Sequence, residues 1–299
     1  MISKRSMSIK NKKVLVIGAG GFVGRQLVTR LQKSGAKVTA VVRRRKINVG
    51  GVTVVRGDLS SVAFCQRIVT GADVVYYLAA AKKNIAHHTA APFDFFYDNV
   101  EPLLVFFNAA RQAKLKKLIY LSSTIVDYIA DQKQLDGYVL GKHVNEFAVR
   151  AFAGQVVFPV TIIRPTVIYG PGDNFDPATA NFLPAIITKV LTAKDQVEVW
   201  GRGVRRLQFI YVDDLADNLI AAAEAKGNFY VIGDHRAIQI NEIVKKIIGI
   251  SGKKLKIVHD TTKPDKPTQL VTFNNLVKPK TSFAKGLQAT IEYYRKKYG

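Results

Sequence analysis

The amino-acid sequence predicts an α/β fold, in which helices cover both faces of a parallel sheet and a smaller α/β region follows. Short runs of β-branched and other apolar residues alternate with stretches of helical periodicity through the first half of the chain. The runs are nearly uninterrupted, as in strands that are buried on both faces. From Tyr169 onward the elements become shorter and turn-forming residues more frequent. With 299 residues, the chain can bury a full core.

The expected elements follow from this alternation. Strands are expected at residues 14–17, 37–42, 52–55, 73–79, 118–121 and 160–163, and helices at 61–70, 92–113 and 138–152, with a further helix that follows the first strand and reaches residue 31. The C-terminal half is expected to contain helices at 183–191, 213–225 and 281–298 and short elements at 197–199, 229–232, 239–248 and 255–258. Asp213 is expected to cap the helix that begins there.

The first strand is followed by three glycines. Gly18, Gly21 and Gly24 stand at three-residue spacing between an apolar run and a helix whose apolar residues recur every three or four positions. Such a turn lets backbone N–H groups approach a pyrophosphate at the positive end of the helix. The motif alone leaves an ordinary glycine-rich turn open. With the strand pattern, it favours a Rossmann-type dinucleotide-binding domain over residues 1–168, onto which residues 205–226 pack back, and a mainly substrate-binding region over residues 169–299.

A tyrosine and a lysine stand four residues apart in the helix expected at 138–152. At this spacing the side chains of Tyr138 and Lys142 lie on one helix face. A tyrosine with a pKa of about 10 is a poor base at neutral pH, and a neighbouring cation lowers that pKa. Ser122, Ser123 and Thr124 follow the fifth strand and place hydroxyls at the carboxyl edge of the sheet. This order predicts acid/base chemistry there; an amphipathic surface helix is the alternative.

Some features have less specific interpretations. The residues of the helix at 138–152 that are expected to enter the core are Val144, Phe147, Ala148 and Ala151. Cys65 is expected to pack in the interior, and His87 and His88 are expected to be exposed. Trp200 is expected to pack, with stacking on a base or sugar as the alternative.

Positive charge dominates the composition. The chain has 45 Lys and Arg against 22 Asp and Glu, a formal net charge of +23. This excess favours anionic partners such as nucleotide cofactors and phosphorylated substrates, although a lysine-rich host proteome would also produce it. The basic residues are scattered and are not interleaved with aromatic ones, so nucleic-acid binding is not expected.

The cysteine and histidine contents and the hydropathy of the sequence further restrict the class of protein. The single cysteine excludes an internal disulfide and fits a reducing compartment, so we expect a cytoplasmic protein. The five histidines lack ligand-like spacing, so no metal is expected. No apolar run reaches the length of a membrane span, and the basic N-terminus lacks the apolar segment of a secretory signal.

The order of short motifs along the chain resembles a known family. These motifs are Gly18-x-x-Gly21-x-x-Gly24, Gly57-Asp58-Leu59, Leu78-Ala79-Ala80, Ser122-Ser123, Tyr138-x-x-x-Lys142 and Arg164-Pro165. Their order is similar to that of the extended short-chain dehydrogenases/reductases, the NAD-dependent epimerase/dehydratase family, over essentially the whole chain. Residues 173–177 and Val199-Trp200-Gly201 are most similar to the GDP-fucose synthase and nucleotide-sugar epimerase branch.

The resemblance implies roles for individual residues. Ser123 would hold the substrate oxygen, Tyr138 would be the general acid/base, and Lys142 would hold the nicotinamide ribose and lower the pKa of the tyrosine. NADP or NAD would be bound by Gly18, Gly21, Phe22, Val23, Gly24, Arg43, Asp58, Leu59, Leu78, Ala79, Ala80, Asn99, Tyr138, Lys142, Pro165 and Val167. The substrate would be bound by Lys82, Asn181, Lys189, Arg205 and Arg206.

Three departures from the family pattern change these expectations. Arg43 stands where an acidic residue would bind the adenosine ribose, and an arginine suits a 2′-phosphate, so NADP is preferred over NAD. Ile125 and Asn181 replace a cysteine and a histidine of the fucose synthase branch, so C3/C5 epimerisation is not expected. Leu207-Gln208-Phe209 replaces an Arg-Asp-Phe run that binds the substrate diphosphate. The candidates to substitute for that arginine are Arg205, Arg206 and Lys189.

The sequence therefore supports one main function and two alternatives. The main expectation is an NAD(P)-dependent oxidoreductase/epimerase that transfers a hydride at a secondary alcohol or ketone of a nucleotide sugar. The alternatives are an NADP-dependent dehydrogenase/reductase of a steroid-like or other hydrophobic alcohol and a non-catalytic NAD(P)-binding scaffold protein. The resemblance also implies a homodimer formed through the helices at 92–113 and 138–152. Neither nucleic acid nor a membrane is an expected partner.

Overall fold

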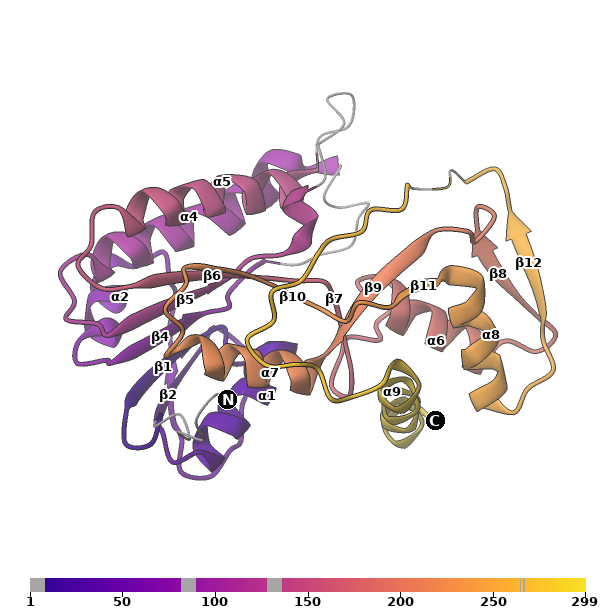
Figure 1. Ribbon diagram of the computed structural model, residues 1–299, viewed down its shortest axis with the longest axis horizontal. Helices are drawn as coiled ribbons and strands as arrows, with labels where there is room; N and C mark the ends of the chain where they lie inside the picture. Colours follow the sequence, from indigo (N-terminus) through magenta and orange to yellow (C-terminus); the bar gives the residue numbers. More distant parts are fainter. Residues whose placement is uncertain (1–8, 82–89, 128–135, 264, 266) are drawn as a thin grey trace.

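The computed structural model describes residues 9–81, 90–127, 136–263, 265 and 267–299. These residues form a seven-stranded sheet in the order β10-β6-β5-β4-β1-β2-β3, in which every neighbouring pair is parallel (Figure 1). The strands are β1 (Lys13–Ile17), β2 (Lys37–Val42), β3 (Thr53–Arg56), β4 (Val74–Tyr77), β5 (Lys117–Leu121), β6 (Val160–Pro165) and β10 (Phe229–Ile232). The predicted doubly wound α/β fold is confirmed.

Helices cover both faces of this sheet. One face carries α2 (Val62–Val69), α4 (Pro92–Ala110) and α5 (Gly137–Ala153), and the other carries α1 (Phe22–Lys33) and α7 (Val212–Ala222) (Figure 1). Leu15 and Ile17 of β1 pack in the first layer, where Cys65 is also buried as predicted. Val14 and Val16 pack in the second layer. Successive side chains of a strand point to opposite faces, so the continuous apolar run of β1 serves both cores.

One strand and one helix of this unit come from far along the chain. β10 pairs with β6, and α7 packs against α1 in the second layer. Arg30 of α1 forms ion pairs with Asp217 (2.6 Å) and Asp213 (3.1 Å) of α7. Tyr211 occupies the N-cap position of α7, so the expectation that Asp213 caps this helix is wrong. The carboxylate binds a cation that is distant in the sequence instead.

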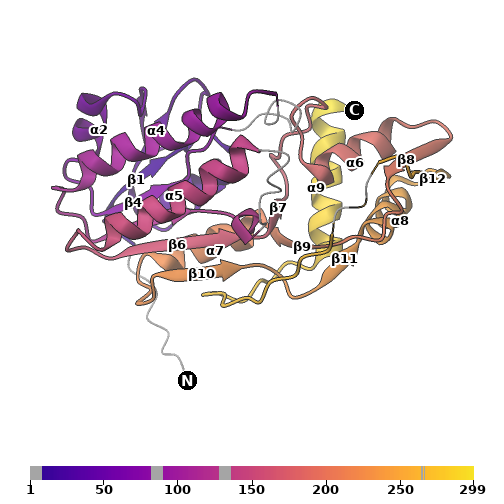
Figure 2. The same cartoon turned by 90° about the horizontal axis from the view of Figure 1, so that it is seen from above.

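The rest of the C-terminal half forms two small sheets around a separate core. β7 (Val167–Tyr169), β9 (Arg206–Tyr211) and β11 (Ala237–Gln239) form one sheet, and β8 (Gln196–Trp200) pairs in parallel with β12 (Lys256–Asp260). The helices are α6 (Phe182–Thr192), α8 (Ile240–Ser251) and α9 (Phe283–Tyr298). Seen from above, this region lies beyond the carboxyl end of β6 (Figure 2). Ligands of doubly wound folds bind at that edge of the sheet.

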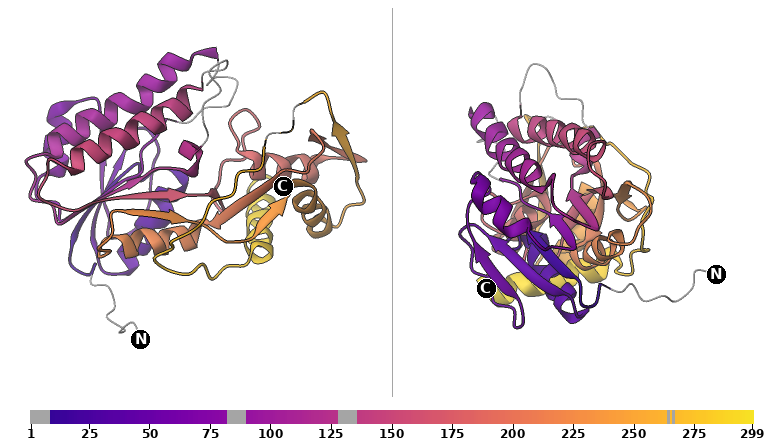
Figure 3. Two further views of the ribbon diagram at one scale, coloured as in Figure 1. Left: turned by 45° about the horizontal axis from the view of Figure 1, so that its top comes forward. Right: turned by 90° about the vertical axis from the view of Figure 1, so that its left-hand side faces the viewer.

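Residues 267–281, here called the return segment, lead from β12 back to the large sheet and then to α9 (Figure 3). Side chains of β9 and α7 bind its backbone. The amide of Gln208 donates to the carbonyl of Val271 and accepts from its N–H, and Asn218 binds Val277 in the same way. These paired hydrogen bonds hold an extended segment, and the N–H of Asn274 in that segment also donates to the carbonyl of Val231 in β10.

The outward face of α5 differs from the expected one. Phe147 is 70% exposed, whereas Val149 and Phe152 are buried. Lys142 and Glu146 lie on the buried face, each only 4% exposed. The prediction that Phe147 and Ala151 enter the core is wrong, because two charged side chains occupy the inner face. Val144 and Ala148 are half-buried.

Candidate active site

The turn between β1 and α1 is shaped for a dinucleotide. Gly18 has a φ of +81°, and a Cβ there would approach the backbone nitrogen of Ala79 to 2.8 Å. A Cβ on Gly24 would overlap the carbonyl oxygen of Gly18. Because side chains are excluded, the backbone stays open to a pyrophosphate at the amino end of α1. These residues therefore fit NAD or NADP.

The other expected cofactor residues gather around this turn. Gly21 is the N-cap residue of α1, and Phe22 and Val23 begin the helix. The N–H of Leu78 donates to the carbonyl of Ile17, which places residues 78–80 beside the glycines. In the same way, the N–H of Gly57 donates to the carbonyl of Val42, which places residues 57–59 beside the end of β2. All three loops border one edge of the sheet.

A basic turn lies against the glycine turn. Arg43 directly follows β2 and is exposed. The Cβ of Arg45 lies 3.0 Å from the position that a Cβ on Gly20 would take. Positive charge is therefore concentrated beside the expected site of the adenosine phosphates.

Asn99 has a structural role in this edge of the sheet. Its side chain is buried, its Oδ1 accepts from the N–H of Ala81 (3.0 Å), and its Nδ2 donates to the carbonyl of Phe95 (2.8 Å). Both ends of the carboxamide are thus used within the protein. Asn99 fixes the loop after β4 in a position that the cofactor would contact.

Residues 122–127, here called the serine-bearing turn, follow β5. Ser123 is half-buried, and its Oγ accepts from the N–H of Ile125 at the start of a 3₁₀ helix, η1 (Thr124–Asp127). Thr124 donates from its Oγ1 to the carbonyl of Pro165 at 3.3 Å, so the turn is tied to the end of β6. Val167 follows as the first residue of β7. Ser123, Pro165 and Val167 therefore lie on adjoining segments.

Tyr138 and Lys142 lie on the inner face of α5. The Asp136 carboxylate caps the helix by accepting from the N–H groups of Tyr138 (2.8 Å) and Val139 (3.2 Å). The Nζ of Lys142 donates to the carbonyl oxygen of Leu121 at 3.2 Å and lies 5.9 Å from the ring centroid of Tyr138. Lys142 thus stands between the tyrosine and the strand that leads to Ser123.

The pKa of the Tyr138 phenol is raised to about 12, by burial first and by the negative charge of Asp136 second. The net shift of this pKa is upward in this structure, and the lowering effect expected of Lys142 stays a prediction. The buried phenol is protonated at neutral pH, which suits it to donate a proton.

An exposed tryptophan and two lysines form a cluster in the C-terminal region. Trp200 is 62% exposed, so the expectation that it packs is wrong. The Nζ of Lys189 lies 5.6 Å from the centroid of its ring system, and the Nζ of Lys263 lies 5.7 Å from it. Lys189 also approaches Glu198, at 4.0 Å. The structure thus brings a predicted substrate residue, Lys189, to an open aromatic surface.

The other predicted substrate residues have different surroundings. Arg206 donates to the carbonyl of Ala237 at 3.2 Å, which ties its side chain to the edge of β11. Arg205 is half-buried, and Asn181 occupies the N-cap position of α6. Lys82 lies outside the described residues, as do His87 and His88.

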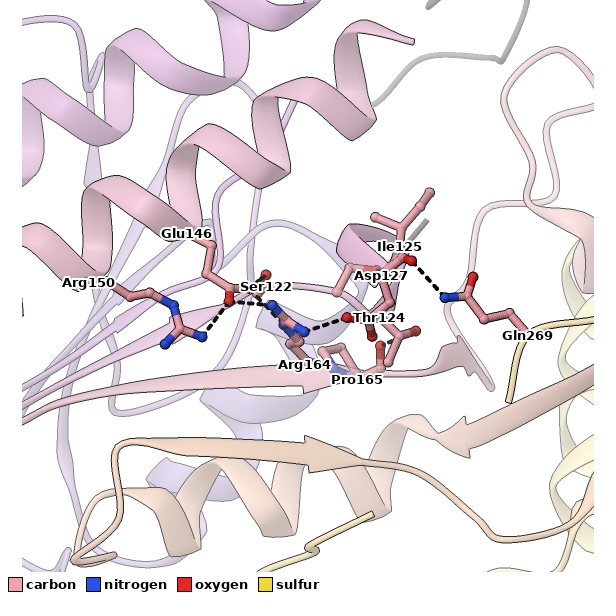
Figure 4. A network of polar contacts seen from close by, with 10 residues as sticks. Ser122, Thr124, Ile125, Asp127, Glu146, Arg150, Arg164, Pro165 and Gln269 are labelled. Carbon is pink, nitrogen blue, oxygen red and sulfur yellow. Dashed lines mark hydrogen bonds and ion pairs between the residues drawn. The ribbon is translucent and has the colours of Figure 1, made fainter. Parts of the chain in front are cut away.

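Sequence reasoning missed an ionic network around the buried Glu146 carboxylate, beside the serine-bearing turn. Glu146, Arg164, Asp127 and Arg150 are joined by ion pairs of 2.6 to 2.9 Å (Figure 4). From the sequence, Arg164 was singled out only as part of the Arg164-Pro165 motif. The spacing of four residues between Lys142 and Glu146 is the signal that could have found the carboxylate, since it places both on one helix face.

The described ranges contain neither a membrane-spanning candidate nor a metal cluster. None of their helices is both long and apolar enough to cross a membrane. They also hold no group of three or more His, Cys, Asp or Glu side chains arranged for a metal ion.

A doubly wound sheet with a glycine turn, and with serine, tyrosine and lysine side chains at the same edge, defines an NAD(P)-dependent enzyme of the extended short-chain dehydrogenase/reductase type. The sequence pattern described as "NAD dependent epimerase/dehydratase family" matches residues 14–233. The chain belongs to this family.

Relatives and solved structures extend the match over nearly the whole chain. GDP-L-fucose synthase 1 of Arabidopsis thaliana is 31% identical and is aligned over 97% of this chain and 95% of its own length. The structure of MoeE5 in complex with UDP-glucose and NAD is 27% identical, with a TM-score of 0.81, covering 96% of this chain and 100% of that one. UDP-N-acetylglucosamine 4-epimerase from Methanobrevibacter ruminantium M1 is 23% identical, with a TM-score of 0.84 and coverages of 96% and 99%.

These comparisons confirm the family expected from the sequence, the fold and the enzyme class. They also confirm that the cofactor is NAD or NADP, since the family is NAD(P)-dependent.

Proposed function

We propose that this enzyme transfers a hydride at a secondary alcohol or ketone of a nucleotide sugar and prefers NADP over NAD. The observation that carries the substrate class is the exposed ring of Trp200, over which the ammonium groups of Lys189 and Lys263 lie. A flat aromatic surface suits a nucleobase, and two ammonium groups suit a diphosphate. The relatives support this choice, because their names refer to nucleotide sugars.

The cofactor would be held by the residues around the glycine turn. Gly18, Gly21 and Gly24 would admit the pyrophosphate, Asp58 and Leu59 would frame the adenine, and residues 78–80 would border it through their backbone. Arg43 would bind a 2′-phosphate, which is the basis of the NADP preference. When bound, the cofactor would accept or donate the hydride at C4 of its nicotinamide.

Tyr138, Ser123 and Lys142 would handle the proton. On reduction the Tyr138 phenol would donate its proton to the substrate oxygen, and on oxidation the phenolate would take it back. Ser123 would donate a hydrogen bond to the same oxygen from its Oγ. The ammonium group of Lys142 would stabilise the phenolate. Burial and Asp136 raise the pKa of the tyrosine, so the phenol is held in the protonated form that the reduction step uses.

Two departures from the family pattern limit the reaction. Ile125, in η1, and Asn181, at the start of α6, carry no group that exchanges a proton at carbon, so ring epimerisation at C3 or C5 lies outside the proposal. Leu207 is buried in the C-terminal core rather than exposed to a ligand. Its presence in place of an arginine therefore does not favour a hydrophobic alcohol as substrate.

A homodimer and a domain division complete the proposal. The helices α4 and α5 lie side by side (Figure 2). Their exposed large apolar side chains are Phe93, Tyr97, Leu104, Leu140 and Phe147. A second copy of the chain would cover this surface, as the family resemblance implies. We also propose that residues 1–168, with 205–226, form the dinucleotide-binding domain and that residues 169–299 mainly bind the substrate.

Thermal unfolding with UDP, GDP and dTDP, in the presence of NADP⁺, tests the substrate class. One nucleoside diphosphate is expected to raise the melting temperature further, and Trp200→Ala is expected to abolish that increment while leaving the increment from NADP⁺ in place. Val204→Ala is the control, since Val204 is also an exposed apolar residue of this region. The absence of an increment with all three nucleotides would contradict the nucleotide-sugar proposal.

A further inference from the structure

Four charged side chains form a network beside the serine-bearing turn, and they come from three different segments. Glu146 and Arg150 belong to α5, Arg164 to β6 and Asp127 to η1. Arg164 donates to both oxygens of the Glu146 carboxylate, from Nη2 to Oε1 at 2.6 Å and from Nε to Oε2 at 2.8 Å. Its Nη1 donates to Oδ1 of Asp127 at 2.6 Å. The Arg164 guanidinium thus bridges two carboxylates with a fixed fork geometry.

The network holds the beginning of the serine-bearing turn against α5. The Glu146 Oε2 atom also accepts from the Oγ of Ser122 at 2.9 Å. One helical turn earlier, Lys142 binds the carbonyl of Leu121. Two inner-face residues of α5 that are one helical turn apart therefore bind Leu121 and Ser122, which directly precede Ser123. Figure 4 shows Glu146 beside Ser122.

The same network holds the end of that turn. Asp127 is the last residue of η1, and its carboxylate is fixed by Arg164. The backbone carbonyl of Asp127 accepts from the Nε2 of Gln269 in the return segment at 2.8 Å. The six residues from Ser122 to Asp127 are thus bound at both ends by the Glu146–Arg164 pair, and Ser123 lies between the two attachments.

We propose that Glu146 and Arg164 are positioning residues that fix Ser123 relative to Tyr138 and Lys142. This inference rests on the roles that the proposed function gives to those three residues. Tyr138 and Lys142 stand on the same helix as Glu146, and Ser123 stands in the turn that Arg164 and Glu146 hold. The ion pair is therefore the connection that sets the spacing between the serine hydroxyl and the tyrosine phenol at the reacting oxygen.

The positive and negative charges of the network compensate one another, which keeps the Glu146 carboxylate ionised. Burial alone would raise the pKa of Glu146, but hydrogen bonds from Arg164, Arg150 and Ser122 hold it below its ordinary value. The carboxylate is therefore ionised over the working pH range. Arg150 is 51% exposed in its side chain and binds Glu146 from the side away from Asp127, so it adds to charge balance without touching the turn.

Kinetics of Glu146→Gln and Arg164→Lys test the inference. Both variants are expected to lower kcat by about 10- to 100-fold, because a displacement of about 1 Å in a reacting group has effects of this size. KM and the dissociation constant for NADPH are expected to stay within about threefold, since neither residue touches the proposed ligands. Arg150→Gln is the matched control and is expected to keep kcat within about twofold. A kcat of Glu146→Gln within twofold of the wild type would overturn the inference.

Two further measurements test the inference if Glu146→Gln does not fold or if no substrate is found. If Glu146→Gln does not fold, Ser122→Ala removes one link to the turn without leaving a buried charge, and an unchanged kcat in that variant overturns the inference. Hydrogen exchange needs no substrate: amides of residues 122–127 are expected to exchange faster in Arg164→Lys and not in Arg150→Gln. Unchanged exchange rejects the positioning role. A wild-type enzyme that reduces no nucleotide ketosugar rejects the proposed function and leaves this comparison decisive.

Discussion

The Asp136 carboxylate accepts from the N–H of Tyr138 at 2.8 Å and, by its charge, adds to the effect of burial that raises the pKa of the Tyr138 phenol to about 12. One residue therefore both caps α5 and favours the protonated form of the proposed acid. Aspartate is common at the N-cap position because its side chain caps the helix. In α5 it also affects the pKa of the proposed acid.

Replacement of Asp136 by asparagine separates these two effects. Asparagine caps a helix about as well as aspartate, so the melting temperature is expected to change little. Loss of the negative charge lowers the pKa of Tyr138. Reduction needs the protonated phenol, so the alkaline limb of its kcat profile is expected to move to lower pH. Asp98→Asn, at an exposed site on α4, is the control, and identical profiles for wild type and Asp136→Asn would contradict the assignment.

A pair of glycine substitutions tests the dinucleotide turn. Gly24→Ala places a Cβ on the carbonyl oxygen of Gly18, so it is expected to destabilise the protein by about 1–3 kcal/mol and to remove the thermal shift given by NADP⁺. At Gly249, in α8, no atom lies within 4 Å of the corresponding Cβ. Gly249→Ala is therefore expected to stabilise by up to about 1 kcal/mol with the cofactor shift intact. Equal cofactor shifts in both variants would show that the turn does not bind the cofactor.

Cofactor preference is expected to depend on Arg43. Arg43→Asp removes the charge proposed to bind a 2′-phosphate and introduces a carboxylate that suits a free ribose hydroxyl. The ratio of the NADP⁺ to the NAD⁺ dissociation constant is expected to rise by at least about tenfold, which calorimetric titration would measure. Lys114→Asp makes a comparable charge change at another exposed site and is expected to leave the ratio unaltered. An unaltered ratio in Arg43→Asp would show that this arginine is a solvated surface residue.

The exposed apolar face of α4 and α5 predicts a concentration-dependent assembly. Phe147→Glu is expected to shift the mass measured by sedimentation from that of a dimer to that of a monomer, because a charge cannot be buried unpaired at the interface. Val157 is fully exposed just beyond α5, and Val157→Glu is the control that keeps the dimer. A wild type that sediments as a monomer at all concentrations would contradict the proposed interface.

Local patterns predicted much of the fold. β2 occupies residues 37–42, as expected, and the other strands of the large sheet that were expected lie within a few residues of their predicted bounds. The inner strands β1, β4 and β5 are buried on both faces, so a continuous apolar run is an adequate signal for them, whereas β3 at the edge is largely exposed. The glycine turn and the Tyr138–Lys142 spacing are also local, and the structure places both at the same edge of the sheet.

What the sequence did not predict depends on partners distant in the chain. Asp213 binds Arg30 rather than capping its own helix. Glu146 is buried because it forms an ion pair with Arg164, which belongs to another element. Once the inner face of α5 is occupied by charged groups, periodicity assigns Phe147 to the wrong side. Trp200 was misplaced for a related reason: an apolar residue at the end of a strand has no pattern that distinguishes a core position from a binding surface.

The central claim, that Tyr138 transfers the proton, is tested most directly by comparing NADPH oxidation by the wild type and Tyr138→Phe over a panel of nucleotide 4-ketosugars. The wild type is expected to turn over at least one of them. Tyr138→Phe is expected to lower kcat by about 10²- to 10⁴-fold, because it removes the acid and keeps the ring. The affinity of the variant for NADPH, measured by titration, is expected to stay within about threefold of the wild-type value. A variant that binds NADPH and turns over at the wild-type rate would contradict the account.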